Sequence, residues 1–239
     1  MATVALTLAL ISGATALIGL LGAYSGLLAP LVGFMLFAAG TLLGGISTLI
    51  VSVIGLVQTR GGRDPEGRRK ALVGSAVGVV LLLVVFGAAS TGGDVPRIND
   101  ITTDLENPPE FASAERVPAY AGRDMSYPEE FVPLVRAAYP DLAPIDLTVA
   151  PPEAFERARA AAQALGWEIV ASDPDRTRFD ARQETALFRF VDDVTVRIVP
   201  RGSGSRIDVR SKSRDGKSDL GANAARIRAF TEQLRSSAG

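Results

Sequence analysis

Apolar residues predominate at the beginning of the chain, and no charged side chain precedes Arg60. As an α-helix this stretch would be about 90 Å long, against a membrane hydrocarbon core of roughly 30 Å. Tyr24 and Pro30 mark the most favourable break, because tyrosine suits the membrane interface and proline suits the first turn of a helix. The pattern therefore predicts two transmembrane helices, at about residues 4–23 and 31–57.

A third apolar run covers residues 71–89 and is long enough for one more crossing. The loop before it, residues 60–70, carries five basic and two acidic side chains. Short loops rich in Lys and Arg stay in the cytoplasm, so we expect residues 1–90 to be a transmembrane region with the N-terminus and this loop inside. Everything that follows would then lie outside the bacterial inner (cytoplasmic) membrane, in the periplasm of a Gram-negative cell. The alternative is that the loop contacts anionic lipid and carries no topological information.

The chain after residue 90 has a different pattern. Residues 91–144 are rich in proline, alanine and charged residues, which predicts a linker and an irregular arm with one short helix at about residues 128–138. Residues 145–239 show the periodicities of a folded core. Apolar stripes predict helices at about residues 151–165 and 219–234.

Between these two helices, apolar and polar residues alternate in short runs that end in turn residues. This alternation predicts a meander of antiparallel strands with one buried face. The predicted fold class is thus a membrane α-helical anchor of three transmembrane helices plus an α+β two-layer sandwich, in which two main helices cover one side of an antiparallel sheet. Residues expected to share strand faces include Trp167, Ile169 and Ala171, and Phe188 with Phe190.

The sequence contains neither cysteine nor histidine. This excludes Ser-His-Asp and Cys-His catalysis and the zinc sites that His or Cys ligands build. An all-carboxylate metal site stays open, but no spacing of acidic residues resembles a calcium loop, and we expect no metal and no cofactor. Two of the 26 acidic residues and five of the 25 basic residues precede residue 91, so the remainder has a net charge near −4. That charge argues against a nucleic-acid partner.

A dense polar segment connects the last predicted strand to the last helix. Asp219, Asn223 and Arg226 fall on one flank of that helix, beside its apolar stripe. Two interpretations stay open: the polar groups satisfy one another, or free N–H groups at the helix start and nearby arginines bind an anion. The candidate residues, for a binding site or a structural network, are Asp208, Arg210, Ser211, Ser213, Arg214, Ser218, Asp219, Asn223 and Arg226.

A second concentration of positive charge lies on the outer face of the predicted sheet. We expect a solvated face with interspersed carboxylates such as Asp180 and Asp208. The alternative is a platform for anionic lipid head groups or cell-wall polymers. The arginines concerned are Arg176, Arg178, Arg189, Arg197 and Arg206.

The polar segment also carries a resemblance to a known family. The pattern Arg210-Ser211-x-Ser213-Arg214-x-Gly216-x-Ser218-Asp219-x-Gly221-x-Asn223-x-x-Arg226-Ile227 resembles the signature of the bacterial and plant family called domain of unknown function 1499. The resemblance covers roughly residues 96–230 and leaves out the three spans, which many members lack. The family has no established activity, so the resemblance implies a hallmark segment and no mechanism. Its other landmarks are Asn99-Asp100-Ile101-Thr102-Thr103-Asp104, Pro108-Pro109, Asp192-Asp193-Val194 and Asp208-Val209.

Three functions compete at this point, and we assign no catalytic residue. The leading hypothesis is a membrane-anchored, non-catalytic module that binds an envelope lipid, polymer or partner protein through residues 210–226. The second is a hydrolase or transferase in which Asp193, Asp208 or Asp219 does acid–base work beside an arginine that stabilises an oxyanion or phosphate. The third is a structural subunit of a membrane complex, with the glycine-rich spans as its interface.

Overall fold

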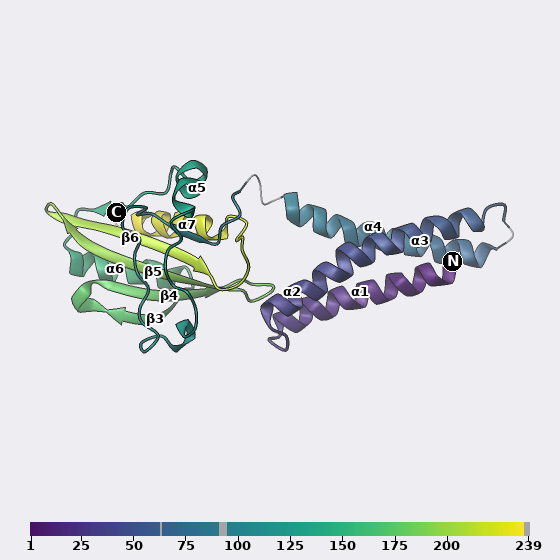
Figure 1. Ribbon diagram of the computed structural model, residues 1–239, viewed down its shortest axis with the longest axis horizontal. Coiled ribbons are helices and arrows are strands. Elements are labelled where there is room, and N and C mark those ends of the chain that lie inside the picture. The colour runs from purple at the N-terminus through teal and green to yellow at the C-terminus, as the bar shows by residue number, and fades with distance from the viewer. Residues whose placement is uncertain (63, 91–94, 237–239) are drawn as a thin grey trace. The chain divides into compact units, whose positions relative to one another are not determined.

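The computed structural model describes residues 1–62, 64–90 and 95–236, and Figure 1 shows its helices and strands. These residues form two compact units, one of apolar helices at the N-terminus and one built around a β-sheet. The helices of the first unit are α1 (Ala2–Tyr24), α2 (Pro30–Ala38), α3 (Gly44–Gln58) and α4 (Pro65–Ser90).

Helices α2 and α3 form one continuous segment, because the π-helical turn Ala39–Leu43 joins them. Pro30 begins this segment at the first helical position, where its missing N–H would have no partner in any case. Three helical segments are long and apolar enough to cross a membrane, which confirms the predicted number: Ala2–Tyr24, Pro30–Gln58 and Pro65–Gly87.

Small side chains line the seams between these helices. On α1 the buried positions are spaced alternately three and four residues apart, which is the 3.5-residue repeat of left-handed helix packing. Thr48, Ser52 and Gly55 continue the same spacing on α3. Small residues let the backbones approach closely, and the large apolar side chains remain on the outside, where lipid would surround them. The buried positions of α1 are Ala2, Ala5, Ala9, Ser12, Ala16, Gly19 and Ala23.

One antiparallel sheet organises the second unit. Its strands are β1 (Asp100–Thr102), β2 (Ile145–Leu147), β3 (Glu168–Asp173), β4 (Arg178–Glu184), β5 (Val191–Arg201) and β6 (Gly204–Ser213). Strands β3 to β6 form the predicted meander, and the short strands β1 and β2 both pair with β6 along its free edge. Thr103 lies between them along β6. Its N–H donates to the carbonyl of Val209, and its hydroxyl accepts from the N–H of Val209, both at 2.9 Å.

Helices α5 (Phe131–Ala138), α6 (Pro151–Ala164) and α7 (Ala222–Ser236) accompany the sheet. Helices α6 and α7 pack on one of its faces (Figure 1). Phe155 of α6 meets Phe179 of β4 with 6.1 Å between ring centroids, and Trp167 stacks on Phe230 of α7 at 5.1 Å. The predicted two-layer α+β sandwich is therefore confirmed.

An irregular segment, residues 105–127, covers the opposite face of the sheet; we call it the strap. Phe111, Val117 and Tyr120 of the strap form a small second apolar cluster. The backbone N–H of Ala112 donates to a carboxylate oxygen of β4 at 2.7 Å, which ties the strap to the sheet beneath it. The arginine-rich face is thus partly covered by the protein itself.

Two local predictions are wrong. No strand covers residues 188–190, where Arg189 has a φ of 57°, in the left-handed region and outside the range of a strand. Trp167, Ile169 and Ala171 do not share one face, because a β-bulge follows Ile169. Beyond the bulge, Ala171 packs beneath the strap, whereas Trp167 and Ile169 pack in the helix-covered core.

Candidate functional site

Arg210 lies on β6 and is 2% exposed beneath the strap. Its Nε and Nη2 donate to the two carboxylate oxygens of Asp100 at 2.9 and 2.7 Å, the bidentate geometry that arginine favours. Its Nη1 donates to the carbonyl of Pro109, and Nη2 also donates to the carbonyls of Met125 and Ser126. All three side-chain nitrogens are thus bonded within the protein.

Two aromatic rings complete the surroundings of Arg210. Its guanidinium carbon lies 4.9 Å from the ring centroid of Phe111 and 5.2 Å from that of Tyr127. Asp100, on β1, is fully buried. One buried cation therefore holds β1, β6 and both ends of the strap together, which is a structural role.

Arg226 of α7 organises a second network, on the helix-covered face of the sheet. Its Nη1 donates to Ser211 Oγ at 3.0 Å and to Asn223 Oδ1 at 2.7 Å. Its Nε donates to Gln183 Oε1 at 2.8 Å, and its Nη2 donates to the carboxylate of Asp192. This arginine also has every side-chain nitrogen bonded, and it is 8% exposed.

The N-terminus of α7 is already filled by the protein's own carboxylate. Asp219 accepts hydrogen bonds from the N–H groups of Gly221 at 2.9 Å and Asn223 at 2.8 Å. Asn223 Nδ2 donates in turn to Ser213 Oγ at 3.0 Å. Ser218, the other predicted cap, makes one long contact of 3.5 Å. An anion at this helix end would have to displace Asp219.

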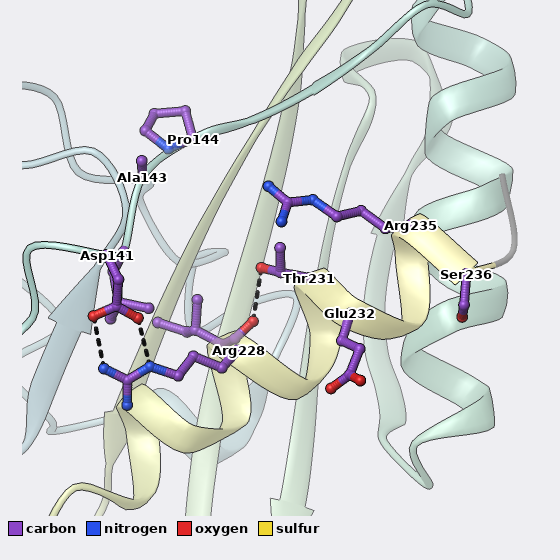
Figure 2. A pocket seen from close by; sticks show the side chains of 10 residues that line it. Asp141, Ala143, Pro144, Arg228, Thr231, Glu232, Arg235 and Ser236 are labelled. Atoms are coloured by element: carbon purple, nitrogen blue, oxygen red, sulfur yellow. Dashed lines mark hydrogen bonds and ion pairs between the residues drawn. The ribbon is translucent and has the colours of Figure 1, made fainter.

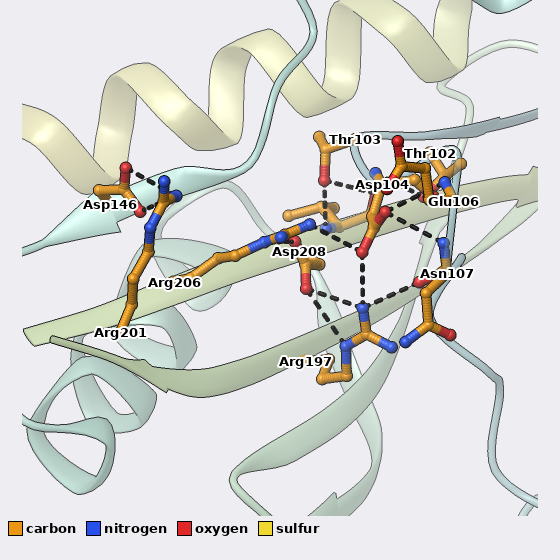
Figure 3. Close-up of polar contacts among 11 residues, drawn as sticks. Thr102, Thr103, Asp104, Glu106, Asn107, Asp146, Arg197, Arg201, Arg206 and Asp208 are labelled. Atoms are coloured by element: carbon orange, nitrogen blue, oxygen red, sulfur yellow. Dashed lines mark hydrogen bonds and ion pairs between the residues drawn. The ribbon is translucent and has the colours of Figure 1, made fainter.

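Asp208 belongs to a third network, which neutralises part of the arginine-rich face (Figure 3). Arg197 contacts Asp208 at 2.8 Å and Asp104 at 3.0 Å, and Arg206 contacts the same two carboxylates at 2.8 and 2.7 Å. Two cations and two anions are paired in this way. The arrangement favours a charge-balanced face over a cationic platform.

Asp180 differs from the solvated carboxylate that we predicted, because it is 3% exposed beneath the strap. It accepts a hydrogen bond from the N–H of Ala112 but forms no ion pair within the described part of the chain. Burial raises the pKa of its carboxyl above the usual value, because the charged form is deprived of water. Burial also raises the pKa of the neighbouring Tyr120 hydroxyl.

The raised pKa of Asp180 predicts a pH-dependent effect of Asp180→Asn. Folded Asp180 holds its proton more tightly than the unfolded chain does, so its contribution to stability is present at low pH and is lost as pH rises through the raised folded pKa. Asparagine keeps an acceptor for Ala112 but does not titrate. The variant should therefore gain unfolding free energy relative to the unmodified protein as the pH rises from the ordinary carboxyl pKa of 3.8 through the raised folded pKa.

Urea unfolding at several pH values measures this difference, with the fluorescence of Trp167, the single tryptophan of the sequence, as the signal. A difference that stays constant with pH, or changes in the opposite direction, would contradict the assignment.

A small cavity of about 200 Å³ opens beside the polar segment; we call it the polar pocket. Arg214 forms its wall and pairs with Asp193 through Nε and Nη2, both at 2.7 Å. Lys212 Nζ contacts Asp100 at 2.9 Å, and Arg123 Nη1 donates to the carbonyl of Arg214 at 3.2 Å. The residues that line the polar pocket are Asn99, Arg123, Asp124, Met125, Asp193, Lys212, Ser213 and Arg214.

A larger cavity of about 640 Å³ lies between α7 and residues 141–144 (Figure 2). Arg228 of α7 pairs there with Asp141 through two hydrogen bonds of 2.6 and 2.8 Å. None of the nine predicted site residues lines this cavity.

The structure separates the arginines that we considered together as an anion site. The side chain of Arg226 lies between α7 and the sheet. Arg210 and Arg214 lie on the opposite face of the sheet, so the three side chains do not converge. Among the described residues, no group of three or more His, Cys, Asp or Glu side chains is placed to hold a metal ion. Residues outside the predicted set complete the networks, and most belong to the landmarks of the family resemblance: Asn99, Asp100, Asp104, Asp192 and Asp193, with Arg123, Gln183 and Lys212 in addition.

The two units define a class of protein, in which apolar helices suited to a membrane precede an α+β sandwich held together by buried ion pairs. The family described as protein of unknown function (DUF1499) matches residues 100–234, more than half of the chain, so the chain belongs to this family. The predicted resemblance is confirmed. No match was found among curated proteins.

Proposed function

We propose that the protein crosses the cytoplasmic membrane three times and holds its DUF1499 domain outside as a non-catalytic module that binds an envelope component or a partner protein. Three helices of suitable length and the basic loop at residues 60–70 support the membrane part of this proposal. With the loop in the cytoplasm, the third helix crosses the membrane once more and carries the domain to the other side.

The polar pocket is the observation that supports a binding role. Arg210 and Arg226 have every side-chain nitrogen bonded within the protein and are buried, so a ligand could not reach them without displacing those contacts. The polar pocket, in contrast, is open and places charged side chains of the same segment, Lys212 and Arg214, beside solvent. A ligand would therefore be expected at the edge of the segment and not at its buried centre.

The contacts of the carboxylates favour binding over catalysis. Asp193 is held by Arg214 at 2.7 Å, Asp208 lies between two arginines, and Asp219 caps α7. Each of the three carboxylates considered for acid–base work is thus committed to a structural partner within the protein, and a proton transfer to a substrate would have to break that contact.

Single-cysteine labelling tests the proposal, because the chain contains no cysteine of its own. Three variants place one thiol each at exposed positions: Glu66→Cys in the loop, Ala160→Cys on α6 and Asp124→Cys at the polar pocket. With a membrane-impermeant maleimide on spheroplasts of the natural host, Ala160→Cys should label and Glu66→Cys should label after lysis alone. Asp124→Cys should label several-fold more slowly in those membranes than in purified protein, because a bound ligand covers it.

Ala160→Cys is the matched control for the last comparison, since its rate should not change on purification. Labelling of Glu66→Cys in intact spheroplasts would overturn the topology. Equal rates for Asp124→Cys before and after purification would overturn the binding role.

A further inference from the structure

We propose that the polar pocket binds a phosphoryl group, in a soluble phosphate ester or in a phospholipid head group. This inference rests on the proposed binding function and specifies its ligand. Three cationic side chains and two carboxylates line the pocket, so it has a net positive charge in a domain whose sequence is acidic. A cavity of this sign concentrates anions from solution.

The carboxylates of the pocket already accept hydrogen bonds within the protein, whereas its cationic side chains keep N–H donors that make no hydrogen bond within the described residues. Asp193 accepts two hydrogen bonds from Arg214, and Asp124 accepts two from Ser126. Lys212 donates one described bond, although an ammonium group carries three protons. Within the described residues, Nη1 of Arg214 and Nη2 of Arg123 have no partner. Free donors of three separate cations are thus available to an acceptor-only group.

The free donors are held in place by the fold. Asp100, which Lys212 contacts, is fixed by the bidentate contact with Arg210, and both Asp100 and Asp193 are buried. Arg123 belongs to the strap and is bonded to two carbonyls, those of Ala119 and Arg214. Donors fixed before the ligand arrives lose little entropy on binding.

The number of donors selects a phosphoryl group over a carboxylate. A phosphate monoester carries a charge of about −1.5 to −2 at pH 7 and three acceptor oxygens, which matches three cations. A carboxylate has one charge and two oxygens and would leave a cation unpaired. The cavity of about 200 Å³ is smaller than the ~300–1,000 Å³ of sites that enclose a whole organic ligand, so it suits a charged head group whose remainder stays outside.

The test uses the purified full chain in dodecyl maltoside and in lipid nanodiscs. Inorganic phosphate, acetate and chloride at equal ionic strength form the soluble series, with binding measured by calorimetry and by the shift in thermal unfolding. In the lipid arm, the fluorescence change of a fluorophore on Asp124→Cys is compared between nanodiscs that contain phosphatidic acid and nanodiscs of phosphatidylcholine alone. We expect phosphate or phosphatidic acid to bind, and acetate to bind at least tenfold more weakly.

Arg123→Gln should weaken phosphoryl binding about tenfold or more, because the variant loses one charge-assisted hydrogen bond to the phosphoryl group. Arg235→Gln, which removes an exposed arginine from the larger cavity, is the matched control and should bind as the unmodified chain does. Binding of phosphate alone assigns a soluble ester, and binding of phosphatidic acid alone assigns a lipid head group.

Three results would overturn the assignment: no binding in either arm, acetate as tight as phosphate, or equal losses in the two arginine variants. If Asp124→Cys is nevertheless protected in host membranes, the proposed binding function stands and this ligand class alone is excluded.

Discussion

Replacing Arg210 by alanine should lower the unfolding free energy of the sheet unit by about 3 kcal/mol, the low end of the roughly 3–5 kcal/mol that breaking a buried ion pair costs. The main cause is Asp100, which is fully buried and would lose its bidentate partner. Lys212 still contacts Asp100 at 2.9 Å and moderates the loss. Three carbonyl groups of the strap would also lose their donor.

Urea unfolding of the full chain in detergent measures this effect through Trp167. Its fluorescence reports the sheet unit specifically, because it is the single tryptophan and it stacks on Phe230 in the helix-covered core. Arg228→Ala is the matched control. Its ion pair with Asp141 is about half exposed, so the expected loss is about 1 kcal/mol or less.

A second variant separates the loss of the pair from the loss of packing. Adding Asp100→Asn to Arg210→Ala removes the buried charge that has lost its bidentate partner and keeps only Lys212, so the double variant should be more stable than Arg210→Ala alone. If Arg210→Ala and Arg228→Ala unfold at the same urea concentration, Arg210 does not clamp the strap to the sheet.

Local periodicity predicted the elements that form the two layers. The apolar stripe predicted for the last helix was Leu220, Ala224, Ile227, Phe230 and Leu234. The last four are fully buried on α7, whereas Leu220 precedes the helix and is 68% exposed. Val194 and Val196 alternate with Thr195 and Arg197 in the sequence, and both valines are buried on β5. These predictions succeeded because neighbouring residues in one element decide which side it buries.

The features that sequence patterns missed depend on distant or non-periodic contacts. The ion pair of Asp100 with Arg210 joins residues 110 positions apart, and no local sequence pattern predicts a partner at that separation. The bulge after Ile169 and the π-turn Ala39–Leu43 each add a residue to an otherwise regular element, which a fixed period cannot represent. The strap has no periodicity, so its cover over Asp180 was not predicted.

The sequence predicted which residues form the polar networks, but it predicted the contacts between them only within the last helix. Asn223 and Arg226 are three positions apart on a helix, and their contact at 2.7 Å followed from helix geometry. Arg210 and Ser211 are adjacent on a strand, where successive side chains point to opposite faces of the sheet. Arg210 therefore contacts the strap and Ser211 contacts α7. Grouping Arg210 with Arg226 as one anion site ignored this alternation.

The helical unit allows a matched pair of substitutions on one helix. A Cβ atom added at Gly19 of α1 would lie 2.5 Å from the backbone oxygen of Gly33 and 2.5 Å from the backbone nitrogen of Phe37. Backbone atoms cannot rotate away, so the two helices must separate. A Cβ atom at Gly13, six residues earlier on α1, would meet nothing within 4 Å. The two glycines differ in their contacts and not in the helix that contains them.

Gly19→Ala should therefore destabilise the helical unit by roughly 1–3 kcal/mol, the usual cost of overpacking, whereas Gly13→Ala should be neutral or slightly stabilising because alanine favours a helix. Ser12→Cys provides the signal, since this position is 5% exposed on the seam of α1 and the chain has no other thiol. Its reaction with N-ethylmaleimide, followed as sodium dodecyl sulfate is added to detergent micelles, reports when α1 detaches. The Gly19→Ala protein should react at a lower fraction of sodium dodecyl sulfate than the Gly13→Ala protein. Equal midpoints would mean that close approach of the backbones does not hold these helices together.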